Sequence, residues 1–542
     1  MTEHKRGIVV IIPAKSDSKR LHNKNIALIG GKPLLYYTIK IAKECGLVDK
    51  IYVSTDSSEI AEFAKKEGAS VIMRPAELCG EVPVVEVYRH ALSNIGDKGI
   101  IYVVGLQPDH PDRTVNLEKT IKFALERDLD DLISVDSNGL KNGSIRIMKA
   151  QALQEGKISI NSGSVMDSST NIHSLNDLKL AQIRLIQADR PLAIKIKNKI
   201  ISKQSPAFII AEGACNHMCD MGLAKKMIDE SEAAGADAIK FQTYKAEKLV
   251  AKHATTYWNY DSTKSQYEYY KNLDKFGRKE YGELFDYAKG KDIVVFSSPF
   301  DIESADMLNE LGMPIFKVAS CLISDIRLIK HIAALNKPII LSTGGSESGE
   351  IQEAVDAIYA EDNYSLVIMA CTLSYPAKDK DAQLMRIKKL NELFPEAIIG
   401  YSDHTEPDEN MVIPSIAVSL GAKVIEKHFT LDRTMTGSGH SFSVDPPLLK
   451  KMVENIRLTE EVLGKGDLGI IGAEQKTREN ARLSIVAKHG IKRGEVIKEG
   501  ALTFKRPGLG ISPKFIDEII GRKATRDIGA EEQLKWDDVV NE

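Results

Sequence analysis

Lysines, serines and histidines accompany short apolar runs throughout residues 206–430. Lys240 and Lys317 lie within two such runs, and His404 and His428 lie at the ends of two others. Fixed cations and hydroxyl groups hold a phosphate by charge and hydrogen bonding, and imidazoles ligate divalent metal ions. These residue types together predict a phosphate pocket beside a metal site. The full set at the run ends is Glu212, Lys240, Gln242, Ser297, Ser298, Lys317, Ser320, Ser342, Thr343, Thr372, Ser402, His404, Lys427 and His428.

The apolar runs predict eight strands. Amphipathic stretches such as GLAKKMIDESEAAG separate them, and eight strand–helix units over roughly 250 residues are typical of a TIM barrel. In that fold the carboxyl ends of the strands meet at one mouth, where active sites lie. The predicted strands are 208–213, 238–242, 293–298, 315–320, 338–343, 366–371, 397–402 and 424–429.

His404 and His428 would end adjacent strands, the seventh and the eighth. Neighbouring strands lie ~4.8 Å apart, so the two imidazoles can share one divalent ion. A single histidine at a strand end is more often a structural hydrogen-bonding group. The pair beside two lysines favours metal ligation.

Two further blocks flank the barrel. From about residue 7 to 180, β-rich runs such as IVVIIPA alternate with amphipathic helical stretches, which indicates a mainly parallel sheet covered by helices. The polar stretch KNKIISKQSP, which ends at Pro206, predicts a linker. From about residue 480, short strands broken by glycine and proline predict a small β-rich domain. We therefore expect an α/β chain with domains at 1–200, 206–465 and 478–542.

Composition limits the possible partners of the chain. A net charge of -3 over 542 residues predicts no nucleic-acid partner and no anionic membrane surface. No segment approaches ~18 uninterrupted apolar residues, and the N-terminal apolar run lacks the cleavage site of a signal peptide. The six cysteines are scattered, as expected for reduced thiols in a cytoplasm. The composition predicts a cytoplasmic enzyme.

Residues 206–540 resemble the sialic acid synthases, a family that includes the legionaminic and pseudaminic acid synthases. The resemblance implies condensation of phosphoenolpyruvate with an open-chain N-acyl hexosamine and release of phosphate. It also implies that the last domain is an antifreeze-like (SAF) domain that reaches over the barrel of a partner subunit in a homodimer. The matching segments are IIAEGACNH, ADAIKFQTYKAE, FSSPFD, FKVAS, LSTGG, YSDHT, EKHFTLD and FKRPGLGISP.

The same resemblance assigns roles to single residues. His404 and His428 would bind Mn2+ or a similar divalent ion. Glu212 and Tyr375 would face the sugar or assist proton transfer, and Arg506 would enter the partner's site to bind the sugar's acyl group. Lys240 and Lys317 would also be catalytic, because they offset phosphate charge. These two lysines would bind phosphoenolpyruvate together with Ser298, Ser320, Ser342 and Ser402, and Gln242 would also bind substrate.

Two positions depart from the family pattern. Leu322 stands where an acidic residue is usual, and Leu373 stands where Asn or Ser is usual. A leucine neither contacts a sugar hydroxyl by hydrogen bonding nor moves a proton, so the acceptor sugar or the activity itself is expected to differ. The cluster Cys215, His217 and Cys219 suggests zinc, but three candidate ligands lack a fourth. We favour a structural role, with His217 in the Asn-His motif of the family.

The loop IPAKSDSKRLHNKNI follows the first predicted strand, and such loops hold a nucleotide phosphate through backbone N–H groups and lysines. Together with RPAEL and LQPDHPDRT it resembles the CMP-sialic acid synthetases up to about residue 115. The resemblance implies a Rossmann-like nucleotidyltransferase domain that binds CTP, with Asp109 as an Mg2+ ligand. The other matching positions are Lys15, Ser18, Lys19, Lys24, Asn25, Arg74 and Gln107.

Three features count against transfer to CTP. Asp17 replaces a glycine of the loop, the segment after DLISVD is short, and Asn171 and His173 replace the late Asp-x-Asp motif. Metal ions neutralise a triphosphate only where carboxylates hold them. Two hypotheses therefore stay open: the chain makes a sugar acid and activates it with CTP, or the N-terminal domain is a non-catalytic nucleotide-binding, sugar-binding or assembly module. A third hypothesis makes the whole chain a sugar-binding or assembly protein.

Overall fold

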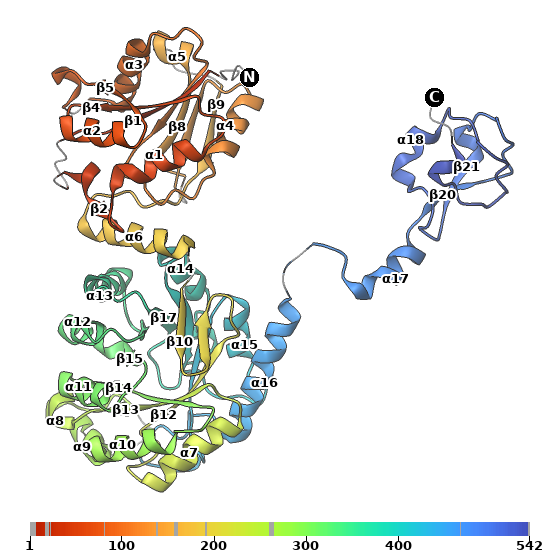
Figure 1. Ribbon diagram of the computed structural model, residues 1–542. Coiled ribbons are helices and arrows are strands. Elements are labelled where there is room, and N and C mark those ends of the chain that lie inside the picture. The colour runs from red at the N-terminus through yellow and green to blue at the C-terminus, as the bar shows by residue number, and fades with distance from the viewer. Residues whose placement is uncertain are drawn as a thin grey trace. The chain divides into compact units, whose positions relative to one another are not determined.

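The computed structural model describes residues 7–16, 21, 23–80, 82–136, 139–156, 161–189, 192–258, 265–464, 466 and 468–539. The chain forms two compact units, Met1–Val462 and Leu463–Glu542. The first unit contains a mixed sheet near the N-terminus and a barrel that follows it in the sequence (Figure 1).

Eight parallel strands form the barrel, which confirms the predicted fold. They pair in the order β14-β13-β12-β19-β18-β17-β16-β15, and the two end strands of that order, β14 and β15, also lie in contact. Nearly every strand residue is buried, because helices cover the outside of the barrel and side chains fill its inside. The strands are β12 (Phe208–Ala214), β13 (Ala238–Thr243), β14 (Val294–Pro299), β15 (Phe316–Val318), β16 (Ile339–Ser342), β17 (Leu366–Cys371), β18 (Ile398–Asp403) and β19 (Val424–His428).

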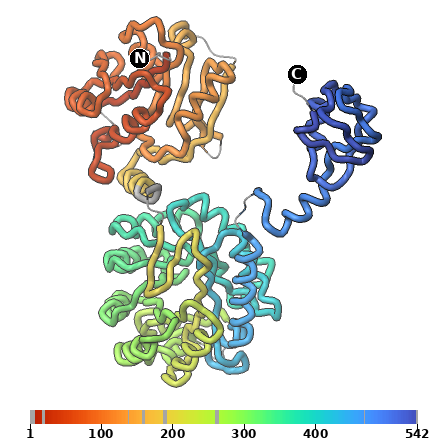
Figure 2. The backbone as a smooth tube through the Cα atoms, turned by 45° about the vertical axis from the view of Figure 1, so that its right-hand side comes forward, coloured from red at the N-terminus to blue at the C-terminus, as the bar shows by residue number. Residues whose placement is uncertain are grey.

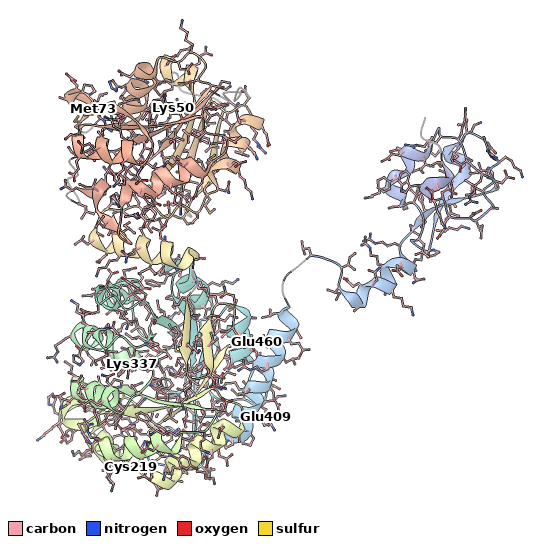
Figure 3. All side chains as sticks on the ribbon, in the orientation of Figure 1. Lys50, Met73, Cys219, Lys337, Glu409 and Glu460 are labelled. Atoms are coloured by element: carbon pink, nitrogen blue, oxygen red, sulfur yellow. The ribbon has the colours of Figure 1, made fainter. Side chains whose placement is uncertain are left out.

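Helices return the chain between the strands. Three of them begin with an aspartate whose carboxylate accepts a backbone N–H of the first turn: Asp220, Asp301 and Asp325. Such a cap contributes about 1 kcal/mol. The last helix, which carries Glu460 (Figure 3), also anchors the start of the barrel. The Glu460 carboxylate accepts the Ala207 N–H at 2.5 Å. The helices are α7 (Met221–Ala233), α10 (Arg278–Tyr287), α11 (Ile302–Glu310), α12 (Ile326–Ala334), α13 (Ser348–Ala360), α14 (Met385–Leu393), α15 (Val412–Ser419) and α16 (Pro446–Leu463).

A β-hairpin stands where a linker was predicted. Strands β10 (Ala193–Ile196) and β11 (Lys199–Ser202) pair antiparallel, and the hairpin lies against the barrel in both views (Figures 1 and 2). The alternation of Ile and Lys puts Ile194, Ile196 and Ile201 on one face, and all three join the barrel's core. The lysines suggested a solvated segment. Lys195 does lie on the other face, but Lys199 pairs with Ile196 and is half-buried at the edge of the isoleucine face.

The N-terminal sheet has seven strands in the order β5-β4-β1-β6-β8-β7-β9. It is mainly parallel, as predicted, except that β8 runs antiparallel to both neighbours. Its strands are β1 (Ile8–Pro13), β4 (Lys50–Thr55), β5 (Ser70–Met73), β6 (Tyr102–Leu106), β7 (Asp131–Val135), β8 (Lys141–Lys149) and β9 (Ser162–Met166). Its helices are α1 (Leu34–Glu44), α2 (Ser58–Lys66), α3 (Val84–Ile95), α4 (Leu117–Glu126), α5 (Ala150–Glu155) and α6 (Leu175–Asp189).

The second unit is small and rich in loops. Helix α17 (Gly472–Ala481) precedes the paired strands β20 (Ser484–Ala487) and β21 (Leu502–Lys505), and α18 (Ile516–Ile519) follows. A separate core that includes Ile485, Ile491 and Leu534 holds it together. Within the described parts of the chain, no helix is both long and apolar enough to span a membrane.

Candidate active site

Charged and polar side chains converge inside one end of the barrel. Lys240 pairs with Glu212 in the ladder between β13 and β12, and His428 pairs with Glu212 on the other side. Because alternate residues of a strand face the same side, Glu426 lies on the same face of β19 as His428. Strand geometry therefore brings these four residues to one place at the carboxyl ends.

Lys240 lies at the centre of a buried ion-pair cluster. Its Nζ is 3.1 Å from Glu212 Oε2 and 3.3 Å from Glu426 Oε2. Lys317 Nζ lies 3.4 Å from Glu426 Oε1. All four side chains are at most 4% exposed. Charges this deeply buried are stable only when they are paired, so the cluster is a fixed arrangement of two cations and two carboxyl groups.

The two carboxyl groups of the cluster have different proton affinities. Burial is the largest effect on Glu212 and raises its pKa to about 7, against the opposing charge of Lys240. Burial acts in the same direction on Glu426, but Lys240 and Lys317 outweigh it and hold its pKa well below the usual range. Burial lowers the pKa of Lys317, with Glu426 opposing. Glu426 is therefore the fixed anion, and Glu212 can exchange a proton near neutral pH.

Glu426 is a residue that the sequence prediction missed. It accepts a hydrogen bond from Ser402 Oγ at 2.9 Å and joins both lysines. The available signal was its position two residues before His428 on one strand, which puts both side chains on the same face. Lys427, which was predicted at the mouth, alternates with these two residues and pairs instead with Asp403 at 2.7 Å.

The predicted serines fall into two groups. Ser298 Oγ accepts a hydrogen bond from Lys240 at 3.3 Å and Ser402 bonds Glu426, so both join the ion-pair cluster. Ser320 Oγ instead accepts the Gly344 N–H at 3.0 Å and lies 3.2 Å from Cys371 Sγ. Ser342 Oγ is buried and finds no hydrogen-bond partner among the described residues. A buried hydroxyl without a partner suits a site that a ligand completes.

Other residues at the predicted strand ends have structural partners. Ser297 Oγ lies 2.7 Å from Thr243 Oγ1. Thr343 Oγ1 donates to the Met369 carbonyl at 3.0 Å, and Thr372 Oγ1 donates to the Asp381 carbonyl at 2.7 Å. Gln242, in contrast, faces the cluster and donates to Glu212 Oε1 at 3.0 Å.

His404 and His428 lie side by side, with ring centroids 5.5 Å apart. His404 Nδ1 is 2.7 Å from the Thr372 carbonyl oxygen, which can only accept, so Nδ1 carries the proton and Nε2 keeps its lone pair. Burial lowers the pKa of His404 to about 4 and that of His428 well below its usual value. Both imidazoles are therefore neutral at pH 7, which is the form that ligates metals.

The histidine pair fits a divalent ion. His428 Nδ1 is buried and lacks a hydrogen-bond partner in the part of the chain that the structure describes. The described residues contain no group of three or more His, Cys, Asp or Glu side chains arranged for a metal. A structural site is closed by four protein ligands, whereas two histidine nitrogens would leave positions open for oxygen ligands from substrate or water.

A cavity of about 150 Å³ opens beside the histidines. The ring of Tyr375 lies 4.5 Å from that of His404 and 5.7 Å from that of His428, measured between centroids. Leu373 lines the cavity and is 43% exposed, whereas Leu322 packs against the barrel core. The walls of the cavity combine aromatic with polar side chains; they include Asn216, Gln242, Tyr244, Tyr257, Tyr269, Tyr270, Phe300, Ser320, Leu373, Tyr375, His428, Ser438 and Phe442.

The side chains of Cys215, His217 and Cys219 have structural surroundings. His217 Nδ1 accepts the Cys219 N–H at 3.1 Å, and the His217 ring stacks on Phe276 with centroids 4.4 Å apart. Cys215 Sγ lies 3.2 Å from Tyr244 Oη. These contacts agree with the structural interpretation of the cluster.

The N-terminal sheet brings several of its predicted residues together. Lys24 Nζ lies 2.8 Å from Asp109 Oδ2 and donates to the Ile172 carbonyl at 3.0 Å. Asn25 donates to the Lys15 carbonyl at 2.8 Å. Two other predicted residues have further partners: Arg74 donates to the Ser54 carbonyl at 2.8 Å, and the Gln107 carbonyl accepts from Arg113. Asp17, Ser18 and Lys19 are outside the described residues.

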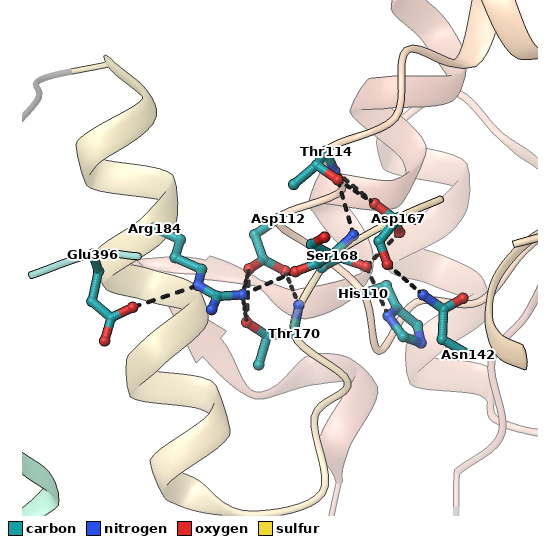
Figure 4. A network of polar contacts seen from close by, with 10 residues as sticks. His110, Asp112, Thr114, Asn142, Asp167, Ser168, Thr170, Arg184 and Glu396 are labelled. Atoms are coloured by element: carbon teal, nitrogen blue, oxygen red, sulfur yellow. Dashed lines mark hydrogen bonds and ion pairs between the residues drawn. The ribbon is translucent and has the colours of Figure 1, made fainter. Parts of the chain in front are cut away.

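Two buried aspartates hold the segment that replaces the Asp-x-Asp motif (Figure 4). Asp167 Oδ1 accepts the Thr114 N–H and hydroxyl, both at 2.8 Å. Asp112 accepts the Thr170 N–H at 2.9 Å and its hydroxyl at 2.7 Å. The next residue, Asn171, has a buried Oδ1 that makes no hydrogen bond within the described ranges.

Comparison with known proteins identifies the parts of the chain. The NeuB family model matches residues 227–468, a cytidylyltransferase model matches 9–111, and a SAF domain model matches 482–540. N,N'-diacetyllegionaminic acid synthase of Campylobacter jejuni is 40% identical over 333 residues, which cover 60% of this chain and 98% of that protein. Human N-acetylneuraminate-9-phosphate synthase is 33% identical over 337 residues, which cover 61% and 93%.

A solved structure also matches a large part of this chain. It comes from Chromobacterium violaceum, bears the name spore coat polysaccharide biosynthesis protein E, and is 25% identical with a TM-score of 0.54. The match covers 62% of this chain and 100% of that one. The chain therefore belongs to the NeuB family of sialic-acid-type synthases, with a cytidylyltransferase-like region before the barrel and a SAF domain after it.

Proposed function

We propose that the barrel condenses phosphoenolpyruvate with the open-chain aldehyde of an N-acyl hexosamine to form a nine-carbon sugar acid. One observation carries this proposal: the buried cluster of Lys240, Lys317, Glu212 and Glu426 lies beside a neutral pair of histidines at one mouth of the barrel. The names of the similar proteins agree with this reaction class.

The cluster is suited to an anionic substrate. When Glu212 is protonated, two lysines face one ionised carboxylate, so the cluster has a net positive charge. The substrate's phosphate and carboxylate groups would accept hydrogen bonds from Lys240, Lys317 and Ser342, whose buried hydroxyl has no partner among the residues that the structure describes. Ser298, Ser320, Ser402 and Gln242 would complete the polar wall.

His404 and His428 would hold Mn2+ or a similar divalent ion, which polarises the acceptor carbonyl when it is bound. His404 suits this role because the Thr372 carbonyl fixes its proton on Nδ1. A neutral histidine pair also adds no charge that would repel a cation.

The bonds change in a defined order. C3 of phosphoenolpyruvate attacks the aldehyde carbon, and the aldehyde oxygen becomes a hydroxyl after it gains a proton. Water adds at C2 and loses one proton, which leaves a hydroxyl there. The bond between C2 and the phosphate oxygen then breaks, the phosphate departs with the electron pair of that bond, and the C2 hydroxyl loses its proton to form the 2-keto acid. Glu212 would transfer one of these protons, because a group with a pKa near the working pH does so most effectively. Tyr375 would face the sugar beside the histidines.

The N-terminal domain has two candidate roles. In the first, Lys15, Lys24 and the other matching residues bind CTP, with Mg2+ at Asp109, and the domain activates the sugar acid made by the barrel. In the second it is a non-catalytic nucleotide-binding, sugar-binding or assembly module. The surroundings of Lys24 favour the second role. Lys24 already neutralises Asp109 at 2.8 Å. It also donates to the Ile172 carbonyl, and the residue before Ile172 is Asn171, whose side chain has no charge to hold a metal ion. Pyrophosphate release from CTP would establish the first role.

The family resemblance supports a homodimer in which the SAF domain of one subunit brings Arg506 to the partner's barrel. Arg506 is exposed in its own unit, as a residue that binds a separate subunit's ligand must be.

An isotope experiment tests the proposed bond cleavage. Phosphoenolpyruvate with 18O at the bridging C2–O position is turned over with Mn2+ and an N-acyl hexosamine, and the released phosphate is analysed by mass spectrometry. Cleavage of the C2–O bond sends the bridging 18O into phosphate. Phosphate without the label would show P–O cleavage and contradict the proposal.

A further inference from the structure

A buried ion pair lies on the outer side of the two strands that carry the histidines. Lys427 Nζ is 2.7 Å from Asp403 Oδ2, and the two side chains are 2% and 0% exposed. Neither residue belongs to the cluster inside the barrel. We propose that this pair is a clamp that fixes the spacing of His404 and His428, so that both are positioned for one divalent ion; the inference rests on the proposed metal site.

The clamp connects the residue after one histidine to the residue before the other. Lys427 Nζ donates to the Thr405 carbonyl at 2.8 Å. Asp403 Oδ1 accepts the Thr405 N–H at 3.0 Å and its hydroxyl at 2.7 Å. Lys427 is covalently next to His428, and Thr405 is next to His404. Movement of either histidine backbone would therefore break several buried hydrogen bonds.

The backbone ladder between β18 and β19 does not supply this restraint, although His428 also pairs with Glu212 in the ladder between β19 and β12. The last paired residues of β18 and β19 are Asp403 and Lys427, so both histidines lie beyond the final pair. Side chains of the last ladder pair hold the strand ends together at the point where backbone pairing stops. On the other side of β18, the Ala377 N–H donates to the His404 carbonyl at 2.7 Å. His404 is thus restrained from both neighbouring strands.

A role in positioning also explains why charges occupy this place. A buried ion pair costs desolvation and often adds little stability over neutral side chains of similar volume. Residues that orient metal ligands typically change metal affinity 10- to 100-fold when they are replaced. The clamp is therefore expected to affect metal affinity more than folding.

Paired neutral substitutions test the clamp without leaving a lone buried charge. The Mn2+ dissociation constant of the full-length D403N/K427M variant is measured by electron paramagnetic resonance, and phosphoenolpyruvate binding without metal is measured by calorimetry. We expect Mn2+ affinity to fall about 10- to 100-fold and phosphoenolpyruvate affinity to stay at the wild-type value. Lys423→Met is the matched control, because Lys423 lies just before the other end of β19 and its Nζ donates to the Ser205 carbonyl, away from the histidines.

The outcomes separate the clamp from the metal site. A folded D403N/K427M variant with wild-type Mn2+ affinity would overturn the clamp alone. Equal losses of Mn2+ and phosphoenolpyruvate affinity would also overturn it, since they would show a general structural defect. Mn2+ binding that persists in His428→Ala would overturn both the clamp and the metal assignment.

Discussion

Glu212 and Glu426 share one cation: Lys240 Nζ lies 3.1 Å from the first carboxylate and 3.3 Å from the second. The two distances are similar, but the two carboxylates have different further partners. Glu426 also bonds Ser402 and pairs with Lys317, whereas the further side-chain partner of Glu212 among the described residues is the neutral Gln242. One site therefore contains a permanently ionised carboxylate and one that titrates near neutral pH.

Glu426→Gln is expected to destabilise the unliganded enzyme. The substitution leaves Lys317 without its ion-pair partner inside the barrel, and removal of one member of a buried pair costs about 3–5 kcal/mol. Bound phosphoenolpyruvate supplies new negative charge, so it should raise the unfolding temperature of Glu426→Gln more than that of the wild type. Thermal unfolding with and without phosphoenolpyruvate measures both effects. An equal ligand-induced shift in the two proteins would contradict the proposed position of the substrate.

Glu212 should make stability depend on pH in a specific direction. Its folded-state pKa of about 7 exceeds the ordinary value of 4.5, so the folded state holds this proton more tightly, and its favourable contribution is lost as pH rises from about 4.5 to about 7. The loss is roughly 3 kcal/mol. Glu212→Gln removes this contribution to the pH dependence. Urea unfolding at pH 5 and pH 8 should therefore show the variant gaining stability relative to wild type at pH 8. Glu392→Gln, on the exposed face of α14, is the control, and a relative stability of Glu212→Gln that does not change with pH would refute the assignment.

Leu373→Asn should change the preference for the acceptor. Leu373 lines the cavity beside the histidines and is 43% exposed, so its replacement should alter stability by no more than about 0.5 kcal/mol. An amide in its place offers hydrogen bonds to a hydroxyl and removes an apolar contact. We expect the KM for acceptors to change about 10-fold or more while the KM for phosphoenolpyruvate stays constant. A parallel change in both KM values would place Leu373 outside the acceptor site.

Subunit mixing tests whether Arg506 serves the partner's site. Arg506→Ala and His428→Ala are each expected to lower activity at least about 10-fold. In a mixed dimer one barrel keeps its own His428 and receives Arg506 from the other subunit, so refolding the two inactive proteins together should restore activity. Mixtures that stay inactive, or a fully active monomer in light scattering, would exclude the crossed arrangement.

The barrel was predictable from sequence because each strand is buried on both faces and leaves a continuous apolar run. The predicted strand 366–371 matches β17 residue for residue. The hairpin β10–β11 was not predicted, since its exposed lysines hide a face of three isoleucines. Strand β8 was not predicted either, and its antiparallel direction depends on pairing with β6 and β7, which no local pattern reports.

The site was predictable to the extent that single residues mark strand ends. His404, His428, Lys240 and Lys317 stand out by type, and the structure brings them to one mouth. The sequence prediction placed Lys427 at the mouth of the barrel and missed Glu426. Adjacent residues of a strand face opposite sides, and the sequence does not state which side is inward. The pairing of Glu212 with Lys240 and His428 in neighbouring strands, a contact between residues distant in sequence, needs the structure.

The most direct test of the account is phosphate release from phosphoenolpyruvate. The full-length protein is incubated with Mn2+ and a panel of N-acyl hexosamines, with His428→Ala as the control and CTP in parallel reactions. We expect phosphate release that depends on one acceptor class and on Mn2+, and that is lost in His428→Ala. Pyrophosphate in the CTP reactions would add the activating role of the N-terminal domain. No phosphate with any acceptor, or equal release by His428→Ala, would contradict the central claim.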